Sequence, residues 1–338
     1  MQGKKKIILP ISVFLLALLL FIVCASNILM PKRYELGANW GAFTAEEANS
    51  MDVVFFGSSL AYCNVIPSVI WEESGFSTYV MAGPEQTVAT TYYYVEEMFR
   101  TQSPSAVMVE LSSVRYDSTD GQDSVKVNIG YMPYDLTRIK ATFGAAPPDQ
   151  RLGLLFPLYN YHDRWNQLTA DDFRLGLNGY DRDMLAGYNY LDKCVPQKEI
   201  RHYSIRQTDE EYAANISWLQ KIAQLCASHN CRCIFYSTAS YAYFEDSYWQ
   251  KLTADLTPWG GEMLNCSQDI DLLNIDPDSD FCDILHFNYR GAVKNSRYLA
   301  DKLADMGIKA SEPYADDQLW QERSAYLQKL IAASEAAQ

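Results

Sequence analysis

The fold is decided by the stretch MDVVFFGSS, which spans Met51–Ser59. A run of β-branched and aromatic residues ends at a glycine and two serines, which is typical of a short strand that is buried on both faces. Two stretches of the same kind follow, FSTYVMAG (Phe76–Gly83) and SAVMVELSS (Ser105–Ser113). A helical pattern separates each pair of strands. This alternation with short loops predicts an α/β fold with a parallel sheet covered by helices on both faces.

Helix boundaries in this half are marked by residues with known preferences. Pro67 suits the first turn of the first connecting helix and Gly75 its end, while Ser103-Pro104 stops the second helix, which we expect over Thr87–Gln102. The rhythm returns near the C-terminus. The expected elements there are a helix over Glu210–Asn230 with Asn230 as a left-handed cap, a strand over Cys231–Ala239, a helix around Tyr248–Leu264, a short last strand at Ile270–Asp276 and a closing helix over Gly291–Gly307.

The chain divides into four parts on this interpretation. Residues 1–31 form a cytoplasmic tip and a transmembrane anchor, 32–50 a polar linker, 51–310 the α/β domain, and 311–338 a C-terminal amphipathic helix. Within the domain, residues 115–208 contain no clean strand and are rich in Gly, Asp and Tyr. We interpret them as a helical and irregular insert over the carboxyl edge of the sheet, where open α/β sheets bind their substrates.

The N-terminus carries a membrane signal. No charged residue occurs from Ile7 to Met30, and about 20 apolar residues are enough to cross a bilayer. Lysines ahead of this segment favour a cytoplasmic N-terminus and an extracytoplasmic domain. A cleaved signal peptide is the alternative, because Val23-Cys24-Ala25 offers small residues for a peptidase. Both interpretations put the body of the protein outside the membrane.

The composition of the chain limits the kinds of molecule that it is expected to bind. The net charge of -14 argues against nucleic acid, since binding phosphates needs a basic face. The 24 tyrosines fit half-buried sheet positions, and also a surface that grips sugars or polymers. Of the eight cysteines Cys24 lies in the apolar segment, which leaves an odd number elsewhere. We expect most of these to be small buried hydrophobes, with one or two disulfides possible, and we expect no metal and no cofactor.

The stretch DILHFNYRGA (Asp283–Ala292) contains two candidate catalytic residues, Asp283 and His286. In a parallel sheet the loops that follow different strands meet at one edge, so this late segment can reach Ser59. A serine hydroxyl needs a base, which His286 can supply, and the imidazole needs a carboxylate such as Asp283 to fix its tautomer. Gly57 permits a sharp exit from the strand, and the backbone N–H groups behind Ser59 face a developing oxyanion.

Three blocks of the chain resemble the SGNH (GDSL-type) hydrolase superfamily: FFGSSLAY, VMAGPEQT and DILHFNYRGA. The resemblance implies a flavodoxin-like three-layer α/β/α fold. It also implies that Ser59 is the nucleophile, His286 the general base and Asp283 its partner, with the N–H groups of Ser59 and Gly83 as the oxyanion hole. More narrowly, the chain is similar to membrane-anchored extracytoplasmic members of Gram-positive bacteria, including D-alanyl-teichoic-acid transfer proteins, which work beside membrane-bound O-acyltransferases.

One departure from that family pattern affects catalysis. The third block normally supplies an Asn to the oxyanion hole, and VMVELSSVRYD (Val107–Asp117) has none. Loss of one such donor lowers turnover by about 10²–10³. Gln86 and His162 are candidate substitutes. His162 and Arg164 are also candidates for contact with an anionic substrate, although a salt-linked surface turn anchored by Trp165 explains them equally well.

These features predict an extracytoplasmic serine esterase or O-acyl transferase that acts on a cell-surface polysaccharide or teichoic-type polymer through an acyl-serine intermediate. The alternative is a catalytically silent binding or scaffolding module that partners a membrane-bound O-acyltransferase. The missing Asn favours the alternative, and the intact set of Ser59, Asp283 and His286 opposes it.

Overall fold

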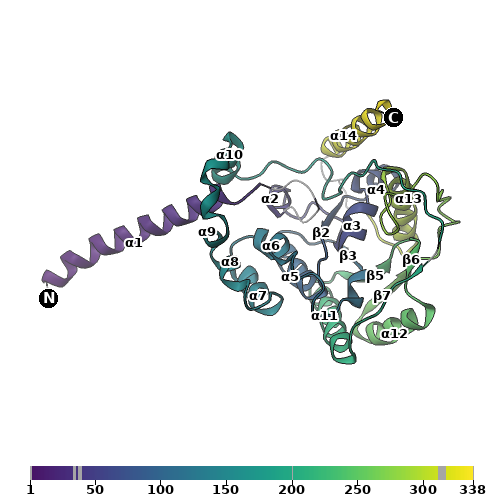
Figure 1. The fold of residues 1–338 in the computed structure, drawn as a ribbon, viewed down its shortest axis with the longest axis horizontal. Helices are drawn as coiled ribbons and strands as arrows, with labels where there is room; N and C mark the ends of the chain where they lie inside the picture. The colour runs from purple at the N-terminus through teal and green to yellow at the C-terminus, as the bar shows by residue number, and fades with distance from the viewer. Residues whose placement is uncertain (1, 33–35, 37–39, 200, 311–316, 338) are drawn as a thin grey trace.

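The computed structural model describes residues 2–32, 36, 40–199, 201–310 and 317–337. At its centre is a five-stranded sheet in which every neighbouring pair is parallel, in the order β2-β1-β3-β5-β7 (Figure 1). The strands are β1 (Val53–Gly57), β2 (Thr78–Ala82), β3 (Ala106–Glu110), β5 (Arg232–Ser237) and β7 (Gly261–Asn265). In chain order these are the second, first, third, fourth and fifth strands of the sheet, which is the flavodoxin-like doubly wound arrangement. The predicted α/β fold is confirmed.

Both faces of the sheet are buried, as the unbroken apolar runs require. Val54 and Phe56 of β1 belong to the core on one side, and Val53 and Phe55 to the core on the other. The first side is covered by α5 (Val88–Met98) and α11 (Asp209–Ser228). The second side is covered by α3 (Ser59–Asn64), α4 (Pro67–Ser74) and α13 (Tyr289–Asp305). Alternation of side chains along each strand therefore produces three layers.

The residues expected at the ends of the helices lie there in the structure. Pro67 is the first residue of α4, and Gly75 caps that helix in the left-handed region with φ 75°. Thr87 caps α5 by accepting a hydrogen bond from the N–H of Thr90. Asn230 follows α11 with φ 56°, a conformation that Asn tolerates. These residues fix where the helices leave the sheet.

The predicted last strand was wrong. Residues 270–274 form turns and 275–276 are irregular. The fifth strand of the sheet is β7, part of which was expected to be helix. That helix, α12 (Asp246–Leu256), is followed by a 3₁₀ turn, η4 (Thr257–Trp259), and stops at Gly260 with φ 88°. β7 is an edge strand with a partly exposed, mixed sequence, so it lacks the apolar signature of the central strands.

The segment expected to be a polar linker is described only in part, since residues 33–35 and 37–39 lie outside the described residues. Where it is described, it contains α2 (Trp40–Phe43). Trp40 and Phe43 are both 2% exposed and pack edge-to-face, and Phe43 also packs against Tyr79 of β2. This stretch therefore belongs to the core of the domain.

The insert is helical, as predicted, and it reaches the membrane signal. Its elements are η1 (Ser112–Arg115), α6 (Val125–Asn128), η2 (Ile129–Tyr131), α7 (Leu136–Gly144), α8 (Arg151–Leu155), α9 (Pro157–Tyr161), η3 (His162–Gln167) and α10 (Ala170–Asn178). α9 and α10 pack against the end of α1 (Gln2–Leu29) (Figure 1). Further along, β4 (Arg201–His202) pairs with β6 (Ala242–Tyr243) in a separate two-stranded sheet.

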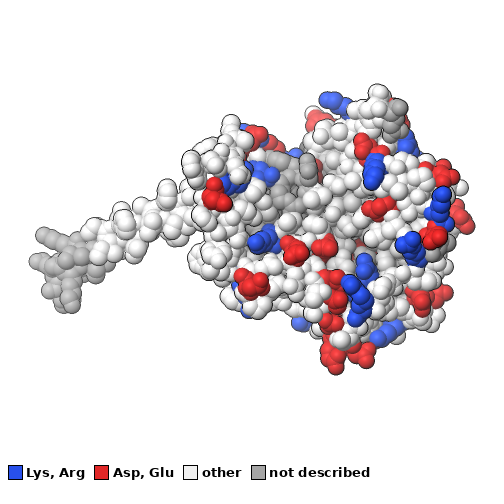
Figure 2. Space-filling model, in the orientation of Figure 1, with Lys and Arg blue, Asp and Glu red and all other residues white. Residues whose placement is uncertain are grey.

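The described parts of both chain ends are helical, and the two helices differ in character. Leu9–Leu29 of α1 is long and apolar enough to cross a membrane, with a mean hydropathy of 2.7, which fits a signal anchor or a signal peptide. At the other end, α14 (Asp317–Ala336) packs on α4 through stacked Trp320 and Trp71, whereas residues 311–316 of the predicted C-terminal helix lie outside the described residues. On the body, acidic and basic side chains are interspersed over the face drawn in Figure 2.

All eight cysteines are free thiols. Most of those in the domain are buried, as expected of small hydrophobes: Cys63, Cys226, Cys231, Cys233 and Cys266.

Candidate functional site

The position of Ser59 follows from the exit of β1. Gly57 ends the strand with φ 147°, and a Cβ there would lie 2.8 Å from the Cβ of Glu110, so only glycine fits. Ser58 then adopts an extended conformation and Ser59 begins α3. The Ser59 side chain is half-buried at the carboxyl edge of the sheet. A strand followed at once by a helix thus presents a hydroxyl at the place where a nucleophile is expected.

Ser59, His286 and Asp283 form a connected set. The Oγ of Ser59 lies 2.7 Å from Nε2 of His286, and Nδ1 of the same ring lies 2.8 Å from Oδ2 of Asp283. The other oxygen of Asp283 accepts hydrogen bonds from the N–H groups of Leu285 and His286, at 2.8 and 2.9 Å. This is the order of contacts in a serine nucleophile, base and orienting carboxylate.

The electrostatics of Asp283 suit that arrangement. Burial alone would raise the pKa of its carboxyl, but the hydrogen bond and the charge of His286, together with the two backbone N–H groups, lower the pKa to about 2. The carboxylate therefore stays ionised near neutral pH. An ionised partner holds the Nδ1 proton of His286 and stabilises an imidazolium formed when Nε2 takes a proton from Ser59.

Asn64, which the sequence analysis missed, locks the histidine loop onto α3. Its side-chain oxygen accepts the N–H of Phe287 at 2.9 Å, and its own carbonyl accepts a hydrogen bond from Nδ2 of Asn295 at 2.8 Å. The loop is closed by an antiparallel bridge between Phe281 and Phe287. Asn64 is fully buried, so these bonds are shielded from water. The one sign of Asn64 in the sequence was its position five residues after Ser59 on the same helix.

A buried carboxyl lies behind the nucleophile, and it too was missed. Glu110 ends β3 with 1% exposure and accepts hydrogen bonds from the N–H and Oγ of Ser112, at 2.9 and 2.6 Å. The Oγ of Ser112 lies 3.2 Å from the Oγ of Ser58. Burial raises the pKa of Glu110 to about 7, against the opposing effects of Ser112, Arg115 and His286. This network occupies the third block, where the sequence lacks an Asn.

Arg115 is a cation without a carboxylate partner in the described part of the chain. Its Cζ lies 4.7 Å from the ring centre of Tyr203 and 5.3 Å from that of Tyr116, so the guanidinium is held between two aromatic rings. Its Nε is buried and makes no hydrogen bond with any described residue. The charge of Arg115 lowers the pKa values of Glu110 and Tyr116, which places it near the network behind Ser58.

The expected oxyanion donors leave neighbouring strands at the same level. The register pairs Gly57 of β1 with Ala82 of β2, so Ser59 and Gly83 follow adjacent strand ends. Among the residues that the structure describes, neither the N–H of Ser59 nor that of Gly83 donates a hydrogen bond. Unpaired N–H groups at such an edge are available to stabilise negative charge.

The other candidate residues have different surroundings. Gln86 is fully buried and its Nε2 donates to Oγ1 of Thr91 at 2.9 Å, so its side chain supports the start of α5. His162 is exposed on η3, with Nδ1 3.3 Å from the carbonyl of Tyr159. Arg164 pairs with Asp172 at 2.8 Å. The structure brings Ser59, Asp283 and His286 together, and it places His162 and Arg164 at the base of α1.

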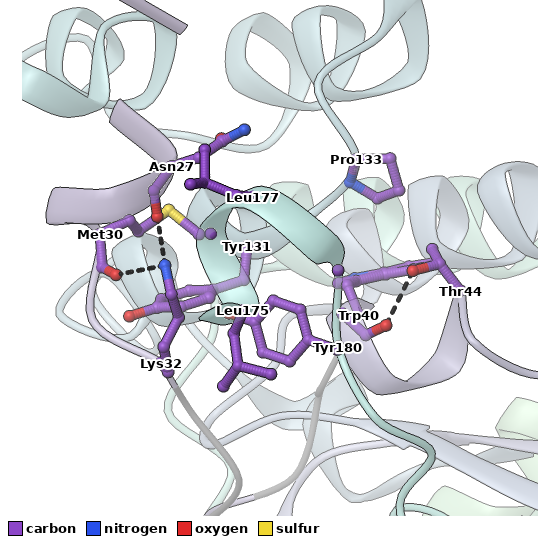
Figure 3. A pocket seen from close by; sticks show the side chains of 13 residues that line it. Asn27, Met30, Lys32, Trp40, Thr44, Tyr131, Pro133, Leu175, Leu177 and Tyr180 are labelled. Carbon is purple, nitrogen blue, oxygen red and sulfur yellow. Dashed lines mark hydrogen bonds between the residues drawn. The ribbon is translucent and has the colours of Figure 1, made fainter. Parts of the chain in front are cut away.

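Arg164 also ties the insert to the apolar helix. Its Nη1 donates to the carbonyl of Leu29 at 2.9 Å, at the last residue of α1. The salt link considered for this segment is therefore present, but Trp165 is 71% exposed and does not anchor the turn. Substrate contact by His162 stays a prediction. A cavity of about 330 Å³ lies in the same region and not at the triad; Lys32, Trp40, Leu177 and Tyr180 are among its lining residues (Figure 3).

Comparison with known proteins adds no family: no protein-family profile and no curated protein matches the chain at a significant level. The class of protein must therefore be inferred from the fold and from the geometry of the site. The parallel α/β sheet with its strand order is consistent with an SGNH-type, flavodoxin-like protein.

Proposed function

We propose that this chain is an SGNH-type serine esterase or O-acyl transferase that works outside the cytoplasmic membrane through an acyl-Ser59 intermediate. The observation that carries the proposal is the pair of short contacts on His286, 2.7 Å to Ser59 and 2.8 Å to Asp283. A general base contributes only within hydrogen-bond reach of the proton that it takes, and His286 meets that condition.

The chemistry proceeds in two halves. Nε2 of His286 takes the proton of Ser59 as Oγ attacks the carbonyl carbon of an ester, and the N–H groups of Ser59 and Gly83 stabilise the resulting oxyanion. The bond to the leaving alkoxide then breaks, and the alkoxide receives the proton from His286. In the second half a water or a polymer hydroxyl gives its proton to His286 and attacks the acyl-Ser59 carbonyl carbon. The bond from that carbon to Oγ then breaks, and Oγ receives the proton back from His286, which releases the acid or the acylated polymer and restores the serine.

The acyl acceptor in this proposal is a cell-envelope glycan or teichoic-type polymer. Arg115 favours an anionic polymer, because a guanidinium that forms no ion pair with any described carboxylate is ready to pair with a phosphate or carboxylate of a substrate. The bond from Arg164 to the last carbonyl of α1 favours an uncleaved anchor over a signal peptide, since cleavage would remove the helix against which the insert packs. An anchored enzyme of this kind fits a membrane-bound O-acyltransferase as partner.

A second function, a silent binding or scaffolding module, is favoured by one observation. Glu110 and Ser112 stand where the family pattern has an oxyanion-binding Asn. If the buried carboxylate repels the negative charge that develops on the substrate oxygen, Ser59 would not turn over substrate. The protein would then only bind its membrane partner through its surface.

Labelling of Ser59 distinguishes the two functions. The detergent-solubilised full chain and its Ser59→Ala variant are exposed to a fluorophosphonate probe, with Ser74→Ala as a matched control on α4. We expect labelling of the wild type and of Ser74→Ala, and none of Ser59→Ala. A folded wild type that takes up no probe would remove the hydrolase proposal and favour the silent module.

A further inference from the structure

The base of α1 is surrounded by exposed apolar side chains. Outside α1, most of the exposed large apolar residues in the described chain lie between Tyr134 and Leu177. Those on or beside the elements that touch α1 are Phe156 at 57%, Tyr159 at 62%, Trp165 at 71%, Phe173 at 48% and Leu177 at 58% exposure. A soluble surface rarely leaves so many large apolar groups together without a partner.

These side chains are fixed relative to α1 by close contacts. A Cβ added to Gly176 of α10 would lie 3.0 Å from the carbonyl oxygen of Asn27 and 3.1 Å from the Cα of Ile28, so the two helices approach backbone to backbone. Arg164 of η3 binds the carbonyl of Leu29. α9, η3 and α10 all pack against α1. The apolar side chains therefore lie at the level of the last turn of α1.

That level coincides with the surface of a bilayer. The apolar window Leu9–Leu29 has 21 residues. At 1.5 Å per residue it is about 30 Å long, which is about the thickness of the hydrocarbon core. The boundary between hydrocarbon and head groups therefore falls near Leu29, where α9 and α10 begin to surround the helix. Tyr and Trp are enriched at this boundary because their rings are apolar and their polar atoms reach water.

Most of the charges on the same elements have partners. Phe173 and Leu177 are four residues apart, so they share one face of α10. Arg164 pairs with Asp172, Arg174 pairs with Asp171 and Asp181, and Lys32 donates to the carbonyls of Asn27 and Met30. Asp163 of η3 is exposed and stays on the water side of the apolar face. In Figure 2 the coloured part of α1 carries no charged side chain, and charged side chains appear on the body at the place of α10.

We propose that this apolar face, made by Phe156, Tyr159, Trp165, Phe173 and Leu177, inserts into the extracytoplasmic leaflet of the membrane that α1 spans. The domain is then attached at two places, by α1 and by the apolar face, and does not swing freely on its anchor. The inference rests on the uncleaved anchor of the proposed function. Because the net charge is -14, the attachment depends on apolar contact and not on attraction to anionic lipid.

Quenching of tryptophan fluorescence by brominated lipid tests this inference. The full chain is reconstituted into phosphatidylcholine vesicles with or without bromine on the acyl chains. α1 contains no tryptophan, so it contributes no signal. The test variant is Trp165→Phe. The matched control is Trp259→Phe, which removes another exposed tryptophan, 44% exposed on η4, away from α1.

The wild type is expected to lose fluorescence in brominated vesicles, and Trp165→Phe to lose most of that quenchable part. Trp259→Phe should be quenched as the wild type is, and raising the salt concentration should change none of these results. Equal quenching of wild type and Trp165→Phe would overturn the inference, as would release of the domain from vesicles by cleavage of α1. Neither readout depends on Ser59, so failure here and failure of fluorophosphonate labelling are separate results.

Discussion

Glu110 puts a proton-binding group directly behind Ser58, next to the proposed nucleophile Ser59. Its carboxyl is buried, its two oxygens accept both hydrogen bonds of Ser112, and Ser112 in turn lies against Ser58. With a pKa of about 7, this carboxyl changes charge near neutral pH. The protonation of Glu110 therefore affects both the stability of the fold and the field around Ser59.

Glu110→Gln should remove a pH dependence of stability. The pKa of this group rises from 4.5 in the unfolded chain to about 7 in the fold, so the folded state keeps a proton that the unfolded state has released. The free energy of unfolding therefore falls as pH rises between these values, by roughly 3 kcal/mol. We expect urea titrations to give Glu110→Gln a stability, relative to wild type, that improves by that amount from about pH 4 to about pH 8. The exposed Glu199→Gln serves as control; a parallel pH profile for Glu110→Gln and wild type would contradict this account.

Arg115→Met should separate substrates by charge. Removing the guanidinium next to Tyr116 and Tyr203 leaves Ser59, Asp283 and His286 in place but deletes a cation that forms no ion pair with any described carboxylate. We expect kcat/KM for an ester that carries a phosphate to fall about tenfold further than kcat/KM for p-nitrophenyl acetate, a difference of about 1.4 kcal/mol. Arg297→Met, on the exposed side of α13, is the matched control. Equal losses for the two esters would show that Arg115 does not recognise an anion.

At the scale of elements, the site depends on how firmly the histidine loop is held on α3. Ser59, the proposed nucleophile, is the first residue of α3, and His286, the proposed base, lies on a loop more than 220 positions later. The two segments are joined by the Ser59–His286 contact itself and by Asn64. Packing of α13 against α3 and α4 supports the same junction. The two segments therefore keep their geometry only while this junction is intact.

Asn64→Ala should loosen this junction. The buried N–H of Phe287 would lose its acceptor, which costs about 1–3 kcal/mol of folding stability. Because His286 is the adjacent residue, we also expect kcat for p-nitrophenyl acetate to fall more than KM rises. Thermal unfolding and steady-state kinetics measure the two effects, with the exposed Gln224→Ala of α11 as control. An unchanged kcat in a destabilised protein would assign Asn64 to the fold alone.

The strands that are buried on both of their faces were predicted from the sequence. Elements without such an apolar pattern were missed. β1, β2 and β3 have unbroken apolar runs and helices with Pro and Gly at their ends, so they were found. β7 was missed because an edge strand with partly exposed residues has no such pattern. α2 was missed because four residues are too few to show a helical period.

The same reasoning explains which site residues could be found. Ser59, Asp283 and His286 carry recognisable types and spacing, and the topology of a parallel sheet brings their loops together. Glu110, Asn64 and Arg115 act through tertiary contacts between distant segments, and no spacing in one segment reveals such contacts. Whether Gly83 stabilises an oxyanion stays a prediction.

At the scale of the whole molecule, the sheet and the contacts of the insert with α1 set the position of the site together. All strand ends point to one edge, so Ser59, Gly83, Glu110 and the histidine loop converge there although they are far apart in sequence. The insert that follows β3 connects this edge to α1 through α9 and α10. On the proposed function, that connection holds the nucleophile at a fixed distance from the membrane, where an envelope polymer and a membrane-bound acyl donor can both reach it.

The central claim is that Ser59 becomes acylated. The most direct measurement is the mass of the Ser59 peptide after the full chain is mixed with p-nitrophenyl acetate and quenched in acid. The account predicts one acetyl group on Ser59 in the wild type and none in Ser59→Ala. In His286→Ala, which lacks the proposed base, it predicts acetylation of Ser59 only at high pH. An unmodified Ser59 peptide in a folded wild type, together with p-nitrophenol release that is unchanged in Ser59→Ala, would contradict the acyl-enzyme, because turnover would then occur without Ser59.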